Sequence, residues 1–169
     1  LEELEQALAR RARIYAEITG FHQETENLNE LFLPDKTGSQ WARTIRLAAQ
    51  NRRVNHINAH APSDVFIDRI EAKAIGEVFG KRKKTLVSSI KGAVGGNFTP
   101  AGVFQAASAA MTLSTGMIPP VRNFLTRDPE CKLNIATNTL RAKNIKRVLI
   151  NTRGVGSYNS SILLERPEI

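Results

Sequence analysis

Residues 53–80 read RVNHINAHAPSDVFIDRIEAKAIGEVFG, and this stretch decides the fold. RVNHINAH is short and apolar enough to form a strand, and APSD follows it as a loop. The next run has apolar residues at helical spacing, with Ser63 or Asp64 as an N-cap and Gly80 just past its end. The stretch therefore predicts a strand, a loop and a helix, with His60 where the strand ends.

Elsewhere the chain alternates between helix-like and strand-like segments without a visible repeat. We expect helices over residues 1–13, 38–51 and 103–116, and strands over residues 13–20, with an end at Gly20, and 84–91. Residues 22–36 resemble a long polar excursion, residues 117–136 a Pro-rich connection, and residues 147–166 two strands around a Gly-rich turn. The order predicts an α/β fold in one domain, residues 1–169, with a layered mixed β-sheet and helices on both faces.

The charge balance favours an anionic partner. The chain has 24 Lys and Arg against 16 Asp and Glu, a net charge of +8. The basic residues fall in short clusters, such as residues 81–84, and none is interleaved with aromatic side chains as single-strand binders require. Solvated loops and helix ends explain most clusters, so we expect no nucleic-acid partner.

Composition also bounds the location and the chemistry. No apolar run reaches the roughly 18 residues of a membrane helix, and no basic-then-apolar leader is visible, so we expect a cytoplasmic protein without a membrane partner. The single cysteine, Cys131, excludes an internal disulfide and is expected to be a surface or packing residue. His22, His56 and His60 lack ligand partners at metal-binding spacing, so we expect no metal.

Three loops follow predicted strands and could carry chemistry: HAPSD, KGAVGGNFTPAG and TRGVGSYN. The glycines of the second loop could let a backbone approach a ligand closely, although a plain strand-to-helix turn is an equal alternative. The loop is not a phosphate-binding Walker loop, because no Gly-Lys-Ser/Thr follows it. The chain offers a possible base and a possible ammonium group, but no nucleophile.

The order of the segments resembles the C-terminal half of the β-ketoacyl-acyl-carrier-protein synthases over essentially all 169 residues. The segments are LEELEQALARRARIYAEITGF, INAHAPSDVFIDRIEAKAIGEVFG, LVSSIKGAVGG, GMIPPVRNFLTRDPECKLNIA and LINTRGVGSYNSSILLE. The resemblance implies the C-terminal half of a thiolase-like fold. It also implies that the nucleophilic cysteine of the family belongs to an N-terminal half outside these residues.

The resemblance assigns family positions to four residues. The histidine of the family motif Asn-Ala-His-Gly-Thr-Ser-Thr falls on His60, and the acidic residues eight and eleven places later fall on Asp68 and Glu71. The lysine of Ser-Ser-Thr-Lys falls on Lys91. His60 and Lys91 thus stand at catalytic positions with Glu71 in support. We expect His60 to be a retained structural residue and Lys91 and Glu71 to form a partly buried ion pair.

The departures from the family are equally specific. The second histidine of the family should stand five residues after Lys91, where this chain has Gly96. Two threonines that hold the phosphopantetheine arm of the carrier protein are replaced by Pro62 and Asp64. The turn Gly-Phe-Gly-Gly-Thr-Asn, whose phenylalanine gates the cysteine, has become residues 153–159, RGVGSYN. Losing an oxyanion donor costs about 10²–10³ in rate in comparable sites.

These departures predict a non-condensing subunit, similar to a chain-length factor, in fatty-acid or polyketide/polyene biosynthesis. It would bind no cofactor, pair with a ketosynthase, and shape the acyl tunnel with Arg153, Val155 and the helix over residues 103–115. An acyl carrier protein is a further expected partner, with contact to its phosphopantetheine in doubt. The alternatives are one half of a split β-ketoacyl synthase whose cysteine is on another chain and, more weakly, a module that holds an acyl group without turning it over.

Overall fold

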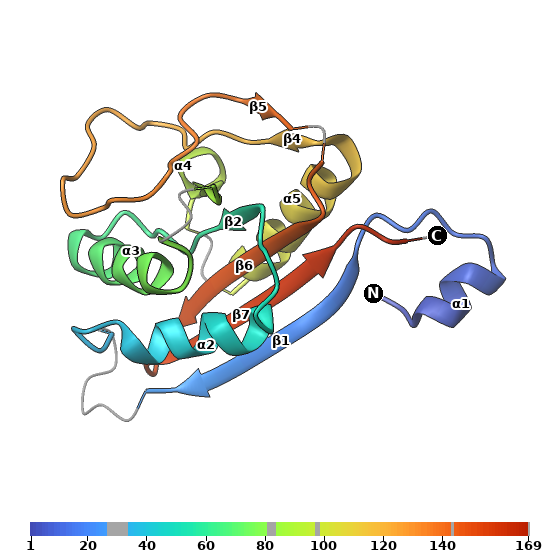
Figure 1. Cartoon of the computed structure of the whole chain (residues 1–169), viewed down its shortest axis with the longest axis horizontal. Helices are drawn as coiled ribbons and strands as arrows, with labels where there is room; N and C mark the ends of the chain where they lie inside the picture. The colour runs from blue at the N-terminus through green and yellow to red at the C-terminus, as the bar shows by residue number, and fades with distance from the viewer. Residues whose placement is uncertain (27–33, 81–83, 97–98, 143, 169) are drawn as a thin grey trace.

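The computed structural model describes residues 1–26, 34–80, 84–96, 99–142 and 144–168, and its centre is a five-stranded sheet (Figure 1). The strand order is β1-β7-β6-β2-β3, with β1, β7 and β6 antiparallel and β6, β2 and β3 parallel. The predicted mixed sheet is therefore confirmed. Its strands are β1 (Glu17–Thr25), β2 (His56–Asn58), β3 (Leu86–Ser88), β6 (Arg147–Gly154) and β7 (Tyr158–Glu165).

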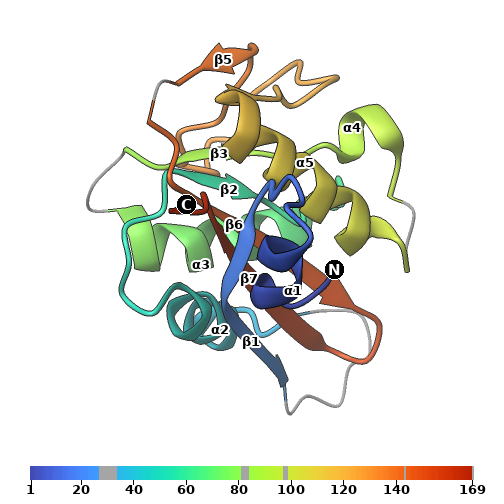
Figure 2. The same cartoon turned by 90° about the vertical axis from the view of Figure 1, so that its right-hand side faces the viewer.

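Helices cover both faces of this sheet, as expected (Figure 2). The described helices are α1 (Leu4–Ala9), α2 (Ser39–Ala49), α3 (Val65–Phe79), α4 (Lys91–Val94) and α5 (Ala101–Thr115). A small second sheet has two strands, β4 (Met117–Ile118) at the start of the Pro-rich connection and β5 (Leu140–Arg141) after it. Among the described residues, no helix combines the length and the apolar character that a membrane crossing requires.

Alternation along β6 divides the core into two parts. Leu149 points to one face, where it joins a cluster with Trp41 and Ile45 of α2 and with residues of α3. Its neighbours Val148 and Ile150 point to the other face and pack in a cluster with residues of α5. Successive side chains of a strand face opposite ways, so one strand serves both cores.

The predicted end of the first strand at Gly20 is wrong, because β1 continues to Thr25. Gly20 is needed there for close packing and does not terminate the strand. A Cβ at this position would lie 2.1 Å from the carbonyl oxygen of Ala48 in α2, and the register of β1 against β7 shifts between Ile18 and Gly20. The first helix is also shorter than expected and ends at Ala9, and residues 27–33 of the expected polar excursion lie outside the described residues.

Replacing Gly20 tests this close approach. Gly20→Ala places a methyl group against a backbone oxygen that cannot rotate away, so we expect a loss of about 1–3 kcal/mol or more in the free energy of unfolding, measured by urea denaturation. Gly76→Ala is the matched control, because a Cβ at Gly76 in α3 would meet no atom of the described residues within 4 Å. That variant should be neutral or gain up to about 1 kcal/mol. Equal behaviour of the two variants would contradict the role given to Gly20.

Candidate functional site

The loop between β2 and α3 presents His60 and is tied down at its far end by Asp64. The Asp64 carboxylate accepts hydrogen bonds from the backbone amides of Phe66 and Ile67, at 2.9 and 3.0 Å, and so caps α3. Ala61 and Ser63 have positive φ angles of 31° and 68°. Since L-residues disfavour this region, the surrounding contacts must hold the loop in place. Asp64 thus has a structural role as the predicted N-cap.

Glu71 of α3 supplies those contacts from inside. Its carboxylate accepts the backbone amides of His60 at 2.9 Å and Ala61 at 2.8 Å, and the side-chain amide of Asn151 at 3.1 Å. Only 2% of Glu71 is exposed, and burial raises its pKa. The expected ion pair between Lys91 and Glu71 is wrong, because the carboxylate is occupied by these amides and no contact of 4.0 Å or less joins the two described side chains.

Lys91 instead contacts His60. The lysine Nζ lies 2.8 Å from His60 Nδ1, and the backbone amide of Arg153 donates to the same nitrogen at 3.3 Å. A nitrogen that accepts from an ammonium and an amide carries no proton, so the neutral ring carries its proton on Nε2. Burial, with Lys91 and Arg153 nearby, lowers the pKa of His60 to about 3. The structure therefore brings together His60 and Lys91, two of the residues assigned from the sequence.

The surrounding titratable groups have shifted pKa values for the same physical reason. Burial lowers the pKa of Lys91 to about 8, although Glu71 and Asp68 partly oppose the effect. Burial also raises the pKa of Asp68 to about 7, with a further increase from Glu71 and Asp64. One carboxylate oxygen of Asp68, Oδ1, is buried without a hydrogen-bond partner among the described residues. Lys91, which contacts His60, and Asp68 are thus both partly desolvated, and their charges interact.

The positions that differ from the family lack the donors that the resemblance implies there. A Cβ at Gly96 would meet no atom of the described structure within 4 Å, so the glycine is not imposed by packing. Pro62 has no hydroxyl or amide to donate, and Asp64 Oδ1 is engaged by the helix N-terminus. Pro62 and Asp64 therefore lack the two hydroxyl donors that the family's threonines give to a phosphopantetheine arm. The residues present do not fit an arm bound through hydrogen bonds at these two positions.

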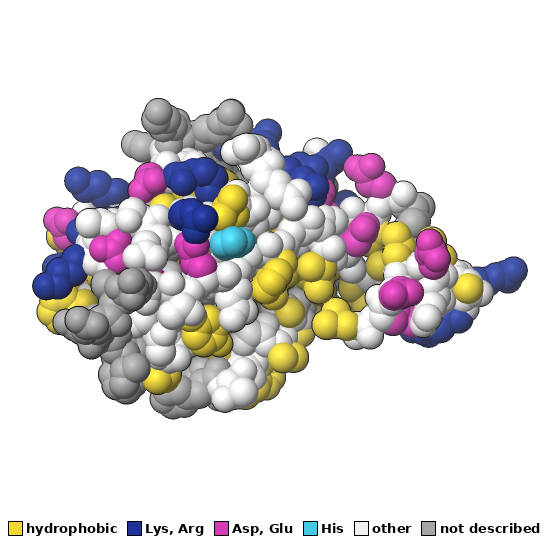
Figure 3. Space-filling model, turned by 90° about the horizontal axis from the view of Figure 1, so that it is seen from below, with side chains coloured by type: hydrophobic (Ala, Val, Ile, Leu, Met, Phe, Trp, Pro, Cys, Tyr) yellow, Lys and Arg dark blue, Asp and Glu magenta, His cyan; other side chains and the backbone are white. Residues whose placement is uncertain are grey.

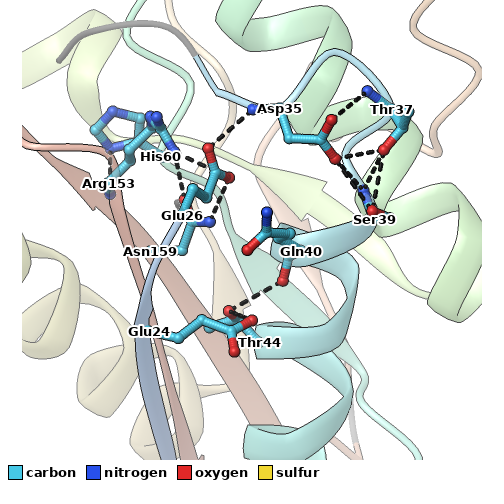
Figure 4. A network of polar contacts seen from close by, with 10 residues as sticks. All are labelled: Glu24, Glu26, Asp35, Thr37, Ser39, Gln40, Thr44, His60, Arg153 and Asn159. Carbon is cyan, nitrogen blue, oxygen red and sulfur yellow. Dashed lines mark hydrogen bonds and ion pairs between the residues drawn. The ribbon is translucent and has the colours of Figure 1, made fainter. Parts of the chain in front are cut away.

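The two predicted tunnel residues lie in different environments. Val155 is 61% exposed at the β6–β7 turn, whereas the buried Arg153 side chain contacts the carboxylate of Glu26 (Figure 4). Its guanidinium also lies over the ring of Trp41. Sequence reasoning missed Glu26, because it stands in a polar stretch that indicated a loop. No local signal in the sequence could have found it, because residues 22–25 are all polar and their strand character comes from pairing with β7.

Other candidate residues lie apart from this group or have no catalytic features. His56 is buried in β2, where its Nε2 lies 2.8 Å from Ser88 Oγ and burial lowers its pKa to about 3. Cys131 is half-buried, and burial raises the pKa of its thiol, which agrees with a packing cysteine. Within the described ranges, no three His, Cys, Asp or Glu side chains gather in a way that could hold a metal ion.

Comparison with solved structures identifies the class of this fold. The chain is similar to the ishigamide ketosynthase/chain length factor, with a TM-score of 0.90 and 28% identity over 98% of this chain and 41% of that one. It is also similar to a β-ketoacyl synthase from Burkholderia phymatum STM815, with a TM-score of 0.90 and 29% identity over 99% of this chain and 41% of that one. The fold is thus a thiolase-like ketosynthase fold.

Sequence comparison gives the family. A family model described as "Beta-ketoacyl synthase, C-terminal domain" matches residues 15–125, more than half of the chain. The chain belongs to this family. It is 34% identical over 99% of its length to the actinorhodin polyketide putative beta-ketoacyl synthase 1 of Streptomyces coelicolor, and 34% identical over 99% to the tetracenomycin polyketide synthase ketoacyl synthase alpha subunit of Streptomyces glaucescens. It covers 37% and 41% of these relatives, so it spans about two fifths of their length.

The charge environment of His60 predicts its titration. His60 should stay neutral, with its proton on Nε2, across pH 5–8 in nitrogen-15 NMR spectra. Lys91→Met removes a cation that helps to keep the ring neutral, so the pKa of His60 should rise. Lys84→Met, an exposed lysine outside the group, should leave it unchanged. A His60 that titrates near its ordinary pKa in the unmodified protein would contradict the buried Lys91 contact.

Proposed function

We propose that this domain acts as a non-condensing, chain-length-factor-like subunit that pairs with a ketosynthase and shapes the acyl tunnel in fatty-acid or polyketide/polyene biosynthesis. The observation that carries the proposal is Gly96. A glycine side chain cannot donate the hydrogen bond that the family's second histidine gives to a thioester oxygen. Similarity to the ishigamide ketosynthase/chain length factor supports the same reading.

Exposed apolar side chains support the requirement for a partner surface. Phe66 on α3, Val103 and Phe104 on α5, and Val155 on the turn are between 47% and 73% exposed. Apolar side chains are also visible across the face of the molecule near α1 (Figure 3). Extensive exposed apolar surface marks interaction sites or makes a protein prone to aggregate. We therefore propose an obligate ketosynthase-like partner that covers part of this surface.

Carrier-protein contact is a weaker part of the proposal. A net charge of +8 suits an acidic partner, and one similar solved structure holds a type II polyketide acyl-carrier protein with its ketosynthase. The shortage of donors at Pro62 and Asp64 argues against a phosphopantetheine arm bound firmly in this pocket. We propose that the carrier protein, where it docks, delivers its arm to the partner ketosynthase.

A second candidate function is one part of a condensing β-ketoacyl synthase whose nucleophilic cysteine lies outside these residues. The observation that favours it is the 2.8 Å contact of Lys91 with His60, which leaves a neutral ring with an Nε2–H donor. No described residue forms a hydrogen bond with that nitrogen. The donor could stabilise a developing oxyanion at a thioester supplied by another part of the enzyme.

Alanine variants separate the two functions. In the complex with its ketosynthase partner, His60→Ala and Lys91→Ala should change malonyl decarboxylation and condensation by much less than tenfold, provided that the complex stays intact on size exclusion. A residue that takes part in proton transfer or oxyanion stabilisation would instead cost about 10²-fold or more. Such a loss with the complex intact would contradict the non-condensing function and favour the second candidate.

A bulky side chain at the turn tests the tunnel. Val155→Trp should shorten the products of the complex, because the exposed turn residue would then fill space that the growing chain occupies. Leu47→Trp is the control, since Leu47 is also exposed but lies on α2. Unchanged product length in Val155→Trp, measured by mass spectrometry, would count against a tunnel wall at this turn.

A further inference from the structure

Glu26 and Arg153 form a buried ion pair at the end of the sheet. Arg153 Nη1 lies 3.2 Å from Glu26 Oε1, and the exposed fractions of the two side chains are 3% and 0% (Figure 4). Asn159, opposite Arg153 across the β6–β7 hairpin, joins both partners. It accepts from Arg153 Nη1 at 2.8 Å and donates to Glu26 Oε1 at 2.7 Å.

This triad fastens the β6–β7 turn to the end of β1. The backbone amide of Glu26 donates to the carbonyl of Ser157 in the turn at 2.7 Å. The second carboxylate oxygen of Glu26 accepts the backbone amide of Asp35 at 2.8 Å, which brings in the segment that leads to α2. A single buried carboxylate thus joins the turn that carries Val155, the last residues of β1 and the approach to α2.

Arg153 also links this ion pair to the candidate site, through Trp41 and His60. The Arg153 guanidinium lies over the Trp41 ring, 5.8 Å from its centroid, and the Trp41 and His60 rings meet edge to face at 6.1 Å. The Arg153 backbone amide donates to His60 Nδ1. Movement of Arg153 would therefore disturb the turn and the histidine together.

Burying the charges of Glu26 and Arg153 costs free energy of hydration, so the position of each side chain relative to the other matters for stability. Arg153 Nε and Nη2 are buried and have no hydrogen-bond partner among the described residues. Charges removed from water lose hydration that their mutual attraction repays only in good geometry, and removal of one partner leaves the other charge uncompensated. Such a pair contributes little net stability, but it strongly disfavours any arrangement in which the turn separates from β1.

We infer that Glu26 and Arg153 are a specificity-determining pair that locks the β6–β7 turn in one position, so that the wall at Val155 is fixed and does not swing. The inference rests on the proposed function for its consequence, a single dominant product length. The lock itself is a property of this chain and is measured separately.

Amide hydrogen exchange of the full-length protein tests the lock. Glu26→Gln keeps the shape of the side chain but removes its charge, and Arg153→Met removes the opposite charge. Each variant should speed exchange of the amides of residues 26 and 35 about tenfold or more. The double variant should have a higher urea midpoint than the two single losses would give together, because no charge is then left unpaired.

Glu24→Gln is the matched control, because Glu24 lies two residues before Glu26, on β1, but pairs with the exposed Arg43. It should leave exchange at residues 26 and 35 unchanged. Unchanged exchange in Glu26→Gln and Arg153→Met, or strictly additive losses in urea midpoint, would overturn the lock.

Product analysis of the complex with a ketosynthase partner tests the consequence. The unmodified complex should give one dominant chain length, and the two single variants should broaden the distribution while Glu24→Gln does not. Faster exchange with an unchanged product distribution would overturn the specificity role. A complex in which the subunit has no effect on product length would refute the proposed function, and the exchange experiment would still decide the lock.

Discussion

The buried carboxylate of Glu71 is the constraint on which the site depends. It holds the amides of His60 and Ala61 against α3, where the loop has to adopt a positive φ angle. From the opposite face, Gln105 of α5 donates its side-chain amide to the carbonyls of Asn58, Ala59 and Asn151, at 3.0–3.1 Å. The end of β2 and the middle of β6 are therefore held from both helical layers, which fixes where His60 can lie.

Much of the fold could be predicted from local patterns in the sequence. The helix after Asp64 followed from its capping residues and the two final strands from apolar runs around a Gly-rich turn, and these signals are contained within a few residues. The extension of β1 could not be predicted in this way. His22 and Glu24 look like solvent-facing loop residues, and their strand character comes from pairing with Ser161 and Asn159, more than 130 positions away.

The site shows the same division between local and long-range information. The resemblance to the family indicated His60 and Lys91, and the structure brings these two side chains into contact. The partner of Lys91 was predicted wrongly, because residue types cannot show that backbone amides already satisfy the Glu71 carboxylate. Glu26 was missed for a related reason. A charged residue in a polar stretch indicates solvent exposure unless its distant partner, here Arg153, is known.

Stability and chemistry place different demands on the residues of this pocket. Glu71 and Lys91 are buried and His60 is half-buried in a hydrogen-bonded network, and the loss of any one would leave polar groups unsatisfied. No atom of the described residues would lie within 4 Å of a Cβ at Gly96, so a side chain there would add no packing against them and its absence leaves no cavity among them. A domain that does not catalyse condensation could therefore lose a hydrogen-bond donor at residue 96 without a loss in the free energy of unfolding, whereas His60 and Lys91 would be retained for stability alone. Their presence is thus compatible with a pocket that no longer performs chemistry, and the glycine is the more informative residue.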